Sequence, residues 1–296
     1  MVRAGYFVRG EEPPQGLDPR YDVVVLQWRQ LWTPEATEVV QSYKATGIEV
    51  HVHVPFAYLN PANDTTAHQA IRAILDEEDG WLKGADGVRV GDCGDKFLID
   101  PRRYRVRRPL LKAHMDVLDD AAWKPDGLFL DFVWDEVAWK DEFRPWSASD
   151  RALLNAQYKT GMYQFVAGLR FALQKAGHPF MDVYGNGWHR CTACDGPVVE
   201  NFPFTKQVDG ERNLDIALNG YYGQDTWFKF NAPPMFMPSN EDENGQAQGE
   251  PGYNVPPKRV VQAVGFANSF AQEDKWASDP VVFDNSGYIF DVIGRL

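Results

Sequence analysis

The sequence predicts an α/β fold, a (β/α)8 TIM barrel that forms a single domain over residues 1–296. Short apolar, β-branched runs alternate with segments of helical periodicity, and this alternation is typical of a parallel sheet built from βα units. About eight such units are found, enough to close a barrel. The length of 296 residues suits a barrel of about 250 residues with insertions, and no repeat or linker divides the chain.

The predicted strands are short and mostly apolar. Tyr21–Gln27 (YDVVVLQ) is continuous and β-branched, as expected of a strand buried on both faces. Ile48–Val54 (IEVHVHV) alternates, and Asp126–Val133 (DGLFLDFV) is the clearest strand of the chain. The other candidates are Tyr6–Arg9, Phe180–Tyr184, Pro197–Glu200, Pro234–Met237 and Val281–Asp284. We expect Tyr21–Gln27, Ile48–Val54 and Gly127–Val133 to be parallel neighbours, allowing for one strand in between.

Helices are predicted between these strands. The first opens at Thr33-Pro34, with proline at its first helical position, and ends near Gly47. A long helix over Ser149–Ala176 keeps its apolar residues at helical spacing, and Gly177 closes it. The other predicted helices span about 66–78, 100–119 and 258–272.

Two polar segments are predicted at the mouth of the barrel. The stretch that begins WLKGADGVRVGDCGDKFLIDP is rich in Gly and Asp and predicts a small β excursion over the mouth. Residues 240–256 are rich in Gly and Pro and lack periodicity, which predicts a long mouth loop.

Composition excludes several classes of partner. The net charge of −12 would repel a phosphate backbone, so we expect no nucleic acid. No run of 18 apolar residues exists, so we expect no membrane association. The first residues, MVRAGYFVRG, carry no secretory signal of the usual kind. We therefore expect a cytoplasmic protein, one released by lysis or in a particle, or a chain numbered from its mature start.

The cysteines do not predict a metal site or a disulfide framework. Cys191 and Cys194 form a C-x-x-C with His189 just upstream, and Cys93 lies far away in the sequence. A structural zinc site needs four ligands as a rule, and a second C-x-x-C is absent. We expect a local disulfide or free thiols, no metal, and no cofactor.

Acidic side chains end two of the predicted strands. In a barrel the active site lies at the carboxyl ends of the strands. Asp131 directly follows Gly127-Leu128-Phe129-Leu130, and Glu200 directly follows Pro197-Val198-Val199. Two carboxylates that face one cleft are the usual equipment for cleaving a glycosidic bond: one protonates the leaving oxygen, and the other attacks the anomeric carbon or activates water. The sequence therefore predicts Asp131 and Glu200 as the catalytic pair of a glycosidase.

Further residues near strand ends are predicted to contact the sugar. Asn186 could hydrogen-bond a hydroxyl or a 2-amino substituent. Tryptophan and tyrosine rings suit the apolar faces of pyranoses, and ten of the residues are Trp. The predicted substrate-binding residues are Trp28, Trp134, Asp135, Tyr184, Asn186, Trp188 and Asp284. Each aromatic residue could equally belong to the core, and Asp284 could belong to a plain turn.

The segments DGLFLDFV and PVVENF resemble those of endo-galactosaminidase-type and spherulin-4-like glycoside hydrolases. Members of this group carry an Asp after a hydrophobic strand, an Asn on a following strand, and a later strand that ends in Glu-Asn. The matching positions are Asp131, Asn186 and Glu200, and the resemblance covers about residues 80–205. It implies a retaining mechanism on a polysaccharide, with Asp131 as nucleophile and Glu200 as general acid/base. A cationic amino-sugar polymer would suit the acidic chain.

Two other functions remain open. One is a non-catalytic carbohydrate-binding barrel, in which the carboxylates lie too far apart or are blocked. The other is a metal-dependent barrel hydrolase that uses His51, His53 and Asp284, because His-x-His on a barrel strand is a known metal pattern.

Overall fold

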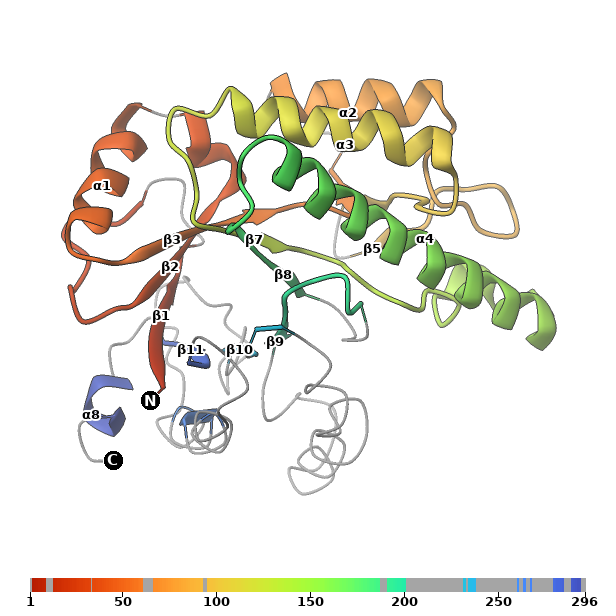
Figure 1. Ribbon diagram of the computed structural model, residues 1–296. Helices are drawn as coiled ribbons and strands as arrows, with labels where there is room; N and C mark the ends of the chain where they lie inside the picture. Colours follow the sequence, from red (N-terminus) through yellow and green to blue (C-terminus); the bar gives the residue numbers. More distant parts are fainter. Residues whose placement is uncertain are drawn as a thin grey trace.

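The computed structural model describes residues 2–8, 13–32, 34–60, 66–92, 95–186, 191–200, 231–232, 234–237, 260, 263–264, 267, 279–284 and 289–293. Eight parallel strands of these residues close into a barrel, in the order β1-β2-β3-β7-β8-β9-β10-β11 and back to β1 (Figure 1). The strands are β1 (Arg3–Phe7), β2 (Val23–Gln27), β3 (Glu49–Val54), β7 (Gly127–Leu130), β8 (Asp182–Asn186), β9 (Gly196–Glu200), β10 (Met235–Met237) and β11 (Val281–Phe283). The predicted (β/α)8 barrel is therefore confirmed.

The three strands expected to be neighbours pair directly, with none between them. Val25 of β2 lies opposite His51 of β3, and His53 of β3 lies opposite Phe129 of β7. All the pairs are parallel, so their carboxyl ends meet at one mouth. The next strand, β8, pairs with β7 on its other side, where Phe129 lies opposite Tyr184.

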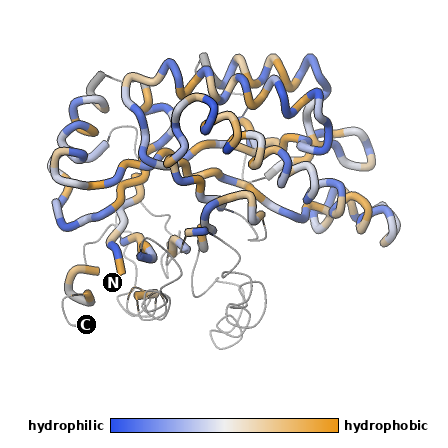
Figure 2. The backbone as a smooth tube through the Cα atoms, viewed as in Figure 1, coloured by the Kyte–Doolittle hydropathy of each residue, from blue (hydrophilic) through white to orange (hydrophobic). Residues whose placement is uncertain are grey.

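Helices pack around the strands. They are α1 (Pro34–Ala45), α2 (Thr66–Glu77), α3 (Tyr104–Asp119), α4 (Ala148–Lys175) and α8 (Ile289–Ile293), with short 3-10 turns η1 (Trp28–Trp32) and η2 (Asp141–Phe143). Helices α2, α3 and α4 lie side by side along one flank of the barrel (Figure 1). Hydrophobic and hydrophilic residues alternate along them, as on half-buried helices (Figure 2). No helix within the described residues is long and apolar enough to cross a membrane.

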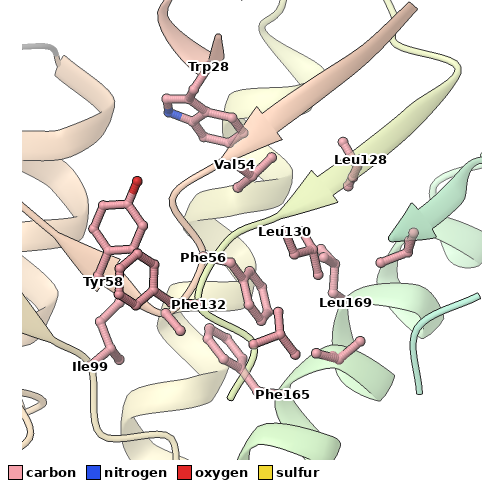
Figure 3. Close-up of a cluster of buried hydrophobic side chains, with 14 of the residues drawn as sticks. Trp28, Val54, Phe56, Tyr58, Ile99, Leu128, Leu130, Phe132, Phe165 and Leu169 are labelled. Atoms are coloured by element: carbon pink, nitrogen blue, oxygen red, sulfur yellow. The ribbon is translucent and has the colours of Figure 1, made fainter. Parts of the chain in front are cut away.

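Strand alternation divides the core into two parts. Outward-facing side chains, such as Val52, Leu128 and Leu130, pack against the helices. Figure 3 shows part of this layer, where Phe56 stacks on Phe165 of α4 with ring centroids 4.1 Å apart. Inward-facing side chains fill the barrel interior: Phe7, Val23, Val25, Phe129, Tyr184, Val198, Met235, Met237, Val281 and Phe283. The barrel is thus a packed core, and chemistry is left to its mouth.

The predicted β excursion also forms. Strands β4 (Tyr58–Leu59), β6 (Lys96–Leu98) and β5 (Gly91–Asp92) make a small antiparallel sheet between β3 and α3, the mouth sheet. The predicted loop over 240–256 lies outside the described residues. Four positions of the predicted helix 258–272 are described, Val260, Ala263, Val264 and Ala267, and all are helical and buried.

Several predicted boundaries were wrong. Strand β1 begins at Arg3 rather than Tyr6, because Arg3 already pairs with Val281 of β11. Strand β7 ends at Leu130 rather than Val133, because the positive φ of Phe132 does not fit a strand. Helix α3 begins at Tyr104 rather than near residue 100, because the Asp100 carboxylate accepts the backbone N–H of Arg102 and holds a local turn. Strand β8 begins at Asp182 rather than Phe180, because Phe180 is 94% exposed and the Met181 amide donates to the His178 carbonyl in a turn.

Two glycines of α4, Gly161 and Gly168, allow the close packing of this helix against its neighbours to be tested by substitution. A Cβ at Gly161 would lie 2.5 Å from the backbone oxygen of Pro101, whereas one at Gly168 would meet mainly a terminal methyl of Leu111, which can move. Alanine favours a helix over glycine by about 1 kcal/mol at both positions. We expect Gly161→Ala to lower the free energy of unfolding by about 1–3 kcal/mol through overpacking. Gly168→Ala, the matched control, should leave it unchanged or raise it in urea denaturation. Equal effects would contradict the close approach.

Candidate active site

The mouth of the barrel carries a layer of polar side chains in register. Phe129 and Tyr184 point into the barrel interior, so the residues two positions later, Asp131 and Asn186, lie on the same inner face one layer higher. His53 of β3 also faces the barrel interior, because it pairs with Phe129 and the two ring centroids lie 5.4 Å apart, and its Nε2 reaches Asp131 from one position below. The mouth therefore brings together polar side chains from three adjacent strands.

Asp131 is the centre of this layer. Its side chain is buried, and its Oδ2 accepts a hydrogen bond from His53 Nε2 at 3.2 Å. Its Oδ1 accepts from Asn186 Nδ2 at 2.8 Å and from the Phe132 amide at 3.0 Å. The carboxylate is thus held from both flanking strands, and both of its oxygens have donors.

The donors around Asp131 keep it ionised. Burial alone raises the pKa of this carboxyl, but the hydrogen bond and charge of His53, the charge of Lys96 and the hydrogen bond from Asn186 together bring the pKa below its ordinary value. A buried carboxylate with a lowered pKa is a base or a nucleophile at neutral pH. It is not suited to donate a proton.

The chain is strained directly after Asp131. Phe132 has a φ of +59°, which is uncommon for a residue with a side chain and clusters at functional sites. The Phe132 ring packs on Tyr58 of the mouth sheet at 4.5 Å and on Trp134 at 4.5 Å. Figure 3 shows Tyr58 and Phe132 next to each other beyond the ends of β3 and β7. This packing offsets the strain and fixes how the Phe132 amide meets Asp131.

A cavity of about 210 Å³ opens beside this layer. It is lined by Gln27, Trp28, Arg29, His53, Pro55, Tyr58, Asn60, His68 and Lys96. His53 belongs both to the cavity wall and to the hydrogen bonds of Asp131, so the cavity adjoins the carboxylate. Two aromatic side chains and several polar groups around a small concave space are typical of a site for a polar ring compound.

The structure brings together several of the residues predicted from sequence. Asn186 bonds Asp131, and Trp28 lines the cavity. The backbone of Glu200 ends β9 at the same mouth, two strands from β7, with Met237 opposite it. The side chain of Glu200, and all of Trp188 and His189, lie outside the described residues.

Three other residues that were predicted to bind the sugar are buried in the core. Tyr184 is 3% exposed and lies inside the barrel among Phe129 and Val198, so it packs there and forms no open stacking wall. Trp134 is mostly buried, between Phe132 and Trp139. Asp284 is fully buried, and its Oδ2 accepts the Ile289 amide at the start of α8 at 2.7 Å. The sequence could not separate these roles because strand ends and core share the same apolar pattern.

Asp135 lies against α4 instead of in the cavity beside Asp131. It is buried, and Lys159 Nζ contacts its Oδ2 at 3.4 Å. A second cavity, of about 360 Å³, is lined by Asp135, Lys159, Thr160, Met162, Tyr163, Gln164 and Cys191. The two cavities share no lining residue.

The cysteines and histidines do not gather into a metal site in the part of the chain that the structure describes, where no three His, Cys, Asp or Glu side chains group closely enough to hold an ion. Cys191 and Cys194 are buried free thiols, and the hydrogen bond from Cys194 lowers the pKa of Cys191. Cys93 and His189 lie outside the described residues. His53 is bonded to Asp131, while His51 lies one layer deeper, 5.8 Å from the Tyr184 ring.

Three contributors to the site are not predicted by the sequence. His53 stands in the sequence only as a candidate metal ligand, whereas in the structure it is a hydrogen-bond partner of Asp131. The alternation of IEVHVHV, together with the register to β7, carries the signal for it. Lys96 and Tyr58 come from the mouth sheet, and their place at the mouth depends on tertiary folding that no local pattern reveals.

Solved structures of glycoside hydrolases share this fold. The chain superposes on the glycoside hydrolase domain of PelA from Pseudomonas aeruginosa with a TM-score of 0.54 and 16% identity, over 96% of this chain and 95% of that one. It matches Aspergillus fumigatus Ega3 in complex with galactosamine with a TM-score of 0.54 and 11% identity, over 96% and 90% of the chains. The match to α-L-fucosidase isoenzyme 2 from Paenibacillus thiaminolyticus has a TM-score of 0.59 and 12% identity, over 99% and 48%.

These likenesses concern the fold and agree with the barrel predicted from sequence. No protein-family model matches the chain, and no curated protein matches its sequence. The chemistry therefore has to be argued from the site itself.

The hydrogen bond from His53 predicts a pH effect. Because the pKa of Asp131 is lowered in the folded protein, its ionised form contributes stability above the ordinary carboxyl pKa, and this is lost as the pH falls through the folded value. We expect His53→Ala to raise the pKa of Asp131, as followed by carboxyl ¹³C NMR. His68→Ala, which changes another histidine of the same cavity, should leave that pKa in place. An unchanged Asp131 pKa in His53→Ala would show that His53 does not hold the carboxylate ionised.

Proposed function

We propose that this chain is a glycoside hydrolase that cleaves a polysaccharide by a retaining mechanism, with Asp131 as the nucleophile and Glu200 as the general acid/base. The observation that carries the proposal is the state of Asp131: a buried, ionised carboxylate held from two strands at the mouth of the barrel, next to an aromatic cavity. The fold that this chain shares with glycoside hydrolase structures supports the same class of chemistry.

The mechanism follows from the two carboxyl groups. Asp131 attacks the anomeric carbon while Glu200 protonates the leaving oxygen, and the bond to the leaving sugar breaks as the bond to Asp131 forms. Glu200 then removes a proton from water, and the water oxygen displaces Asp131 from the anomeric carbon. The lowered pKa of Asp131 suits attack rather than proton donation, so the acid role falls to the other carboxyl group.

The neighbours of Asp131 have positioning roles in this scheme. His53 and Asn186 fix the carboxylate so that one oxygen faces the sugar, and they stabilise its charge when it leaves in the second step. Trp28 and Tyr58 are the tryptophan and tyrosine that line the cavity wall. Ega3 was solved with galactosamine, which supports an amino-sugar polymer as one candidate substrate.

Removing either carboxyl group tests the assignment. We expect Asp131→Asn and Glu200→Gln each to lower the release of reducing ends from a polysaccharide panel by at least 10²–10⁴-fold, because each change removes the nucleophile or the proton donor. Asp135→Asn, which removes a buried carboxylate of the second cavity, should cost less. Circular dichroism must show that each variant is folded. Ordinary turnover by Asp131→Asn would overturn the assignment.

The anomeric outcome is a second test. A retaining pair sits about 5–5.5 Å apart, and an inverting pair about 6.5–9.5 Å apart to admit water. We expect ¹H NMR of the first products to show the anomeric configuration of the substrate. Products of opposite configuration would make Asp131 a general base that activates water. Binding without hydrolysis would favour a non-catalytic carbohydrate-binding barrel.

A further inference from the structure

The cavity beside Asp131 is lined by positively charged side chains that the proposed reaction does not require. Its charged lining side chains among the described residues are basic, and none of its lining residues is acidic. Lys96 comes from the mouth sheet and Arg29 from η1 after β2, so two separate elements deliver a cation to one small space. His68 adds no charge at neutral pH, because burial lowers its pKa.

Lys96 is the more informative of the two cations. It is half-buried, and its ammonium lies 4.6 Å from the Tyr58 ring and 5.6 Å from the Phe132 ring. Within the described residues, no carboxylate oxygen lies within 4 Å of its Nζ. Once water is excluded, a contact with an aromatic ring stabilises an ammonium less than an ion pair with a carboxylate does. A ligand that fills the cavity removes water from Lys96, so it has to supply a counter-charge or acceptors of its own.

Lys96 and Asp131 both contact Phe132: the Lys96 ammonium lies 5.6 Å from its ring, and its backbone amide donates to Asp131 Oδ1 at 3.0 Å. The charge of Lys96 accordingly helps to lower the pKa of Asp131. A sugar whose anomeric carbon faces Asp131 therefore has its substituents within the field of Lys96. The net charge of −12 does not oppose this at close range, since salt screens charges beyond about 8 Å under physiological conditions.

We propose that the cavity lined by Lys96 and Arg29 is a subsite for a sugar unit with an anionic substituent, a carboxylate or a sulfate. The inference rests on the proposed glycoside hydrolase function and names the substrate class of that site. It differs from a purely cationic amino-sugar polymer, which the overall acidity of the chain would suit. The acidic group binds the two cations, while the ring lies along Trp28 and Tyr58.

Matched polymers test this inference. Polygalacturonate, alginate and hyaluronan are compared with their carboxyl-reduced forms, and carrageenan with its desulfated form, next to a galactosamine polymer. We expect kcat/KM on an anionic polymer to exceed that on its neutral counterpart by roughly 10- to 100-fold, the value of one charge-assisted hydrogen bond. Preference within the carboxyl or the sulfate pairs identifies the anion.

Variants of Lys96 assign the preference to the cavity. Lys96→Gln should remove most of the preference through KM, while Lys96→Arg should retain it. Lys112→Gln, which removes an exposed lysine on the outer face of α3, is the matched control and should behave as the wild type. A preference that survives Lys96→Gln unchanged would overturn the subsite.

The two hypotheses fail in different ways. Hydrolysis of only neutral or galactosamine polymers would overturn the anionic subsite and keep the glycoside hydrolase function. If no polymer is hydrolysed, that function fails, and calorimetry with galacturonate and glucuronate oligosaccharides decides the subsite by itself. Binding that Lys96→Gln weakens at least 10-fold supports it, and the absence of binding overturns it.

Discussion

The carboxylate of Asp131 is buried at the mouth of the barrel, and its hydrogen bonds to His53 and Asn186 are the constraint on which the site depends. An unpaired buried carboxylate would take up a proton or destabilise the fold. Donors must therefore come from both flanking strands, close to the end of β7. Only the observed register of β3, β7 and β8 supplies them, because a shift by one residue would turn each polar side chain out of the barrel. Fold and chemistry are specified by the same pairing.

The mouth sheet supplies further contacts around Asp131. Its residues Tyr58 and Lys96 pack on Phe132, whose backbone is strained directly after Asp131. Strain of this kind persists only where the surroundings over-determine it. The mouth sheet thus packs against Phe132 in the segment after β7. It also places the Lys96 ammonium where its charge helps to lower the pKa of Asp131. Tyr58 and Lys96 also line one wall of the cavity, so the same two residues shape the site and stabilise the strained backbone at Phe132.

The sequence predicted the barrel and the strand carrying Asp131, because apolar runs alternating with helical periodicity are a local signal. It also placed Asp131, Asn186 and Glu200 at strand ends, and the structure shows that these belong to the fourth, fifth and sixth strands around the barrel. It predicted Tyr184 as a sugar-binding residue, whereas this ring packs inside the barrel. Whether a ring lies inside the barrel depends on strand register, which composition does not reveal. Lys96 escaped notice for a similar reason: it is remote in sequence from every barrel strand and reaches the site through an antiparallel pairing.

The partner of His53 bears on the choice between the proposed glycosidase and a metal-dependent hydrolase. The alternation His51-x-His53 on a barrel strand is compatible with a metal site, in which both rings would need acceptor nitrogens turned towards one ion. In the structure the two rings are used differently. His51 lies in a deeper layer, near Tyr184 and Glu49, whereas His53 Nε2 donates to Asp131. A nitrogen that donates a hydrogen bond has no lone pair for a metal, so Nε2 of His53 is committed to Asp131. The histidine that suggested a metal enzyme thus donates to Asp131 and helps to keep this carboxylate ionised, the state that the proposed attack on an anomeric carbon requires.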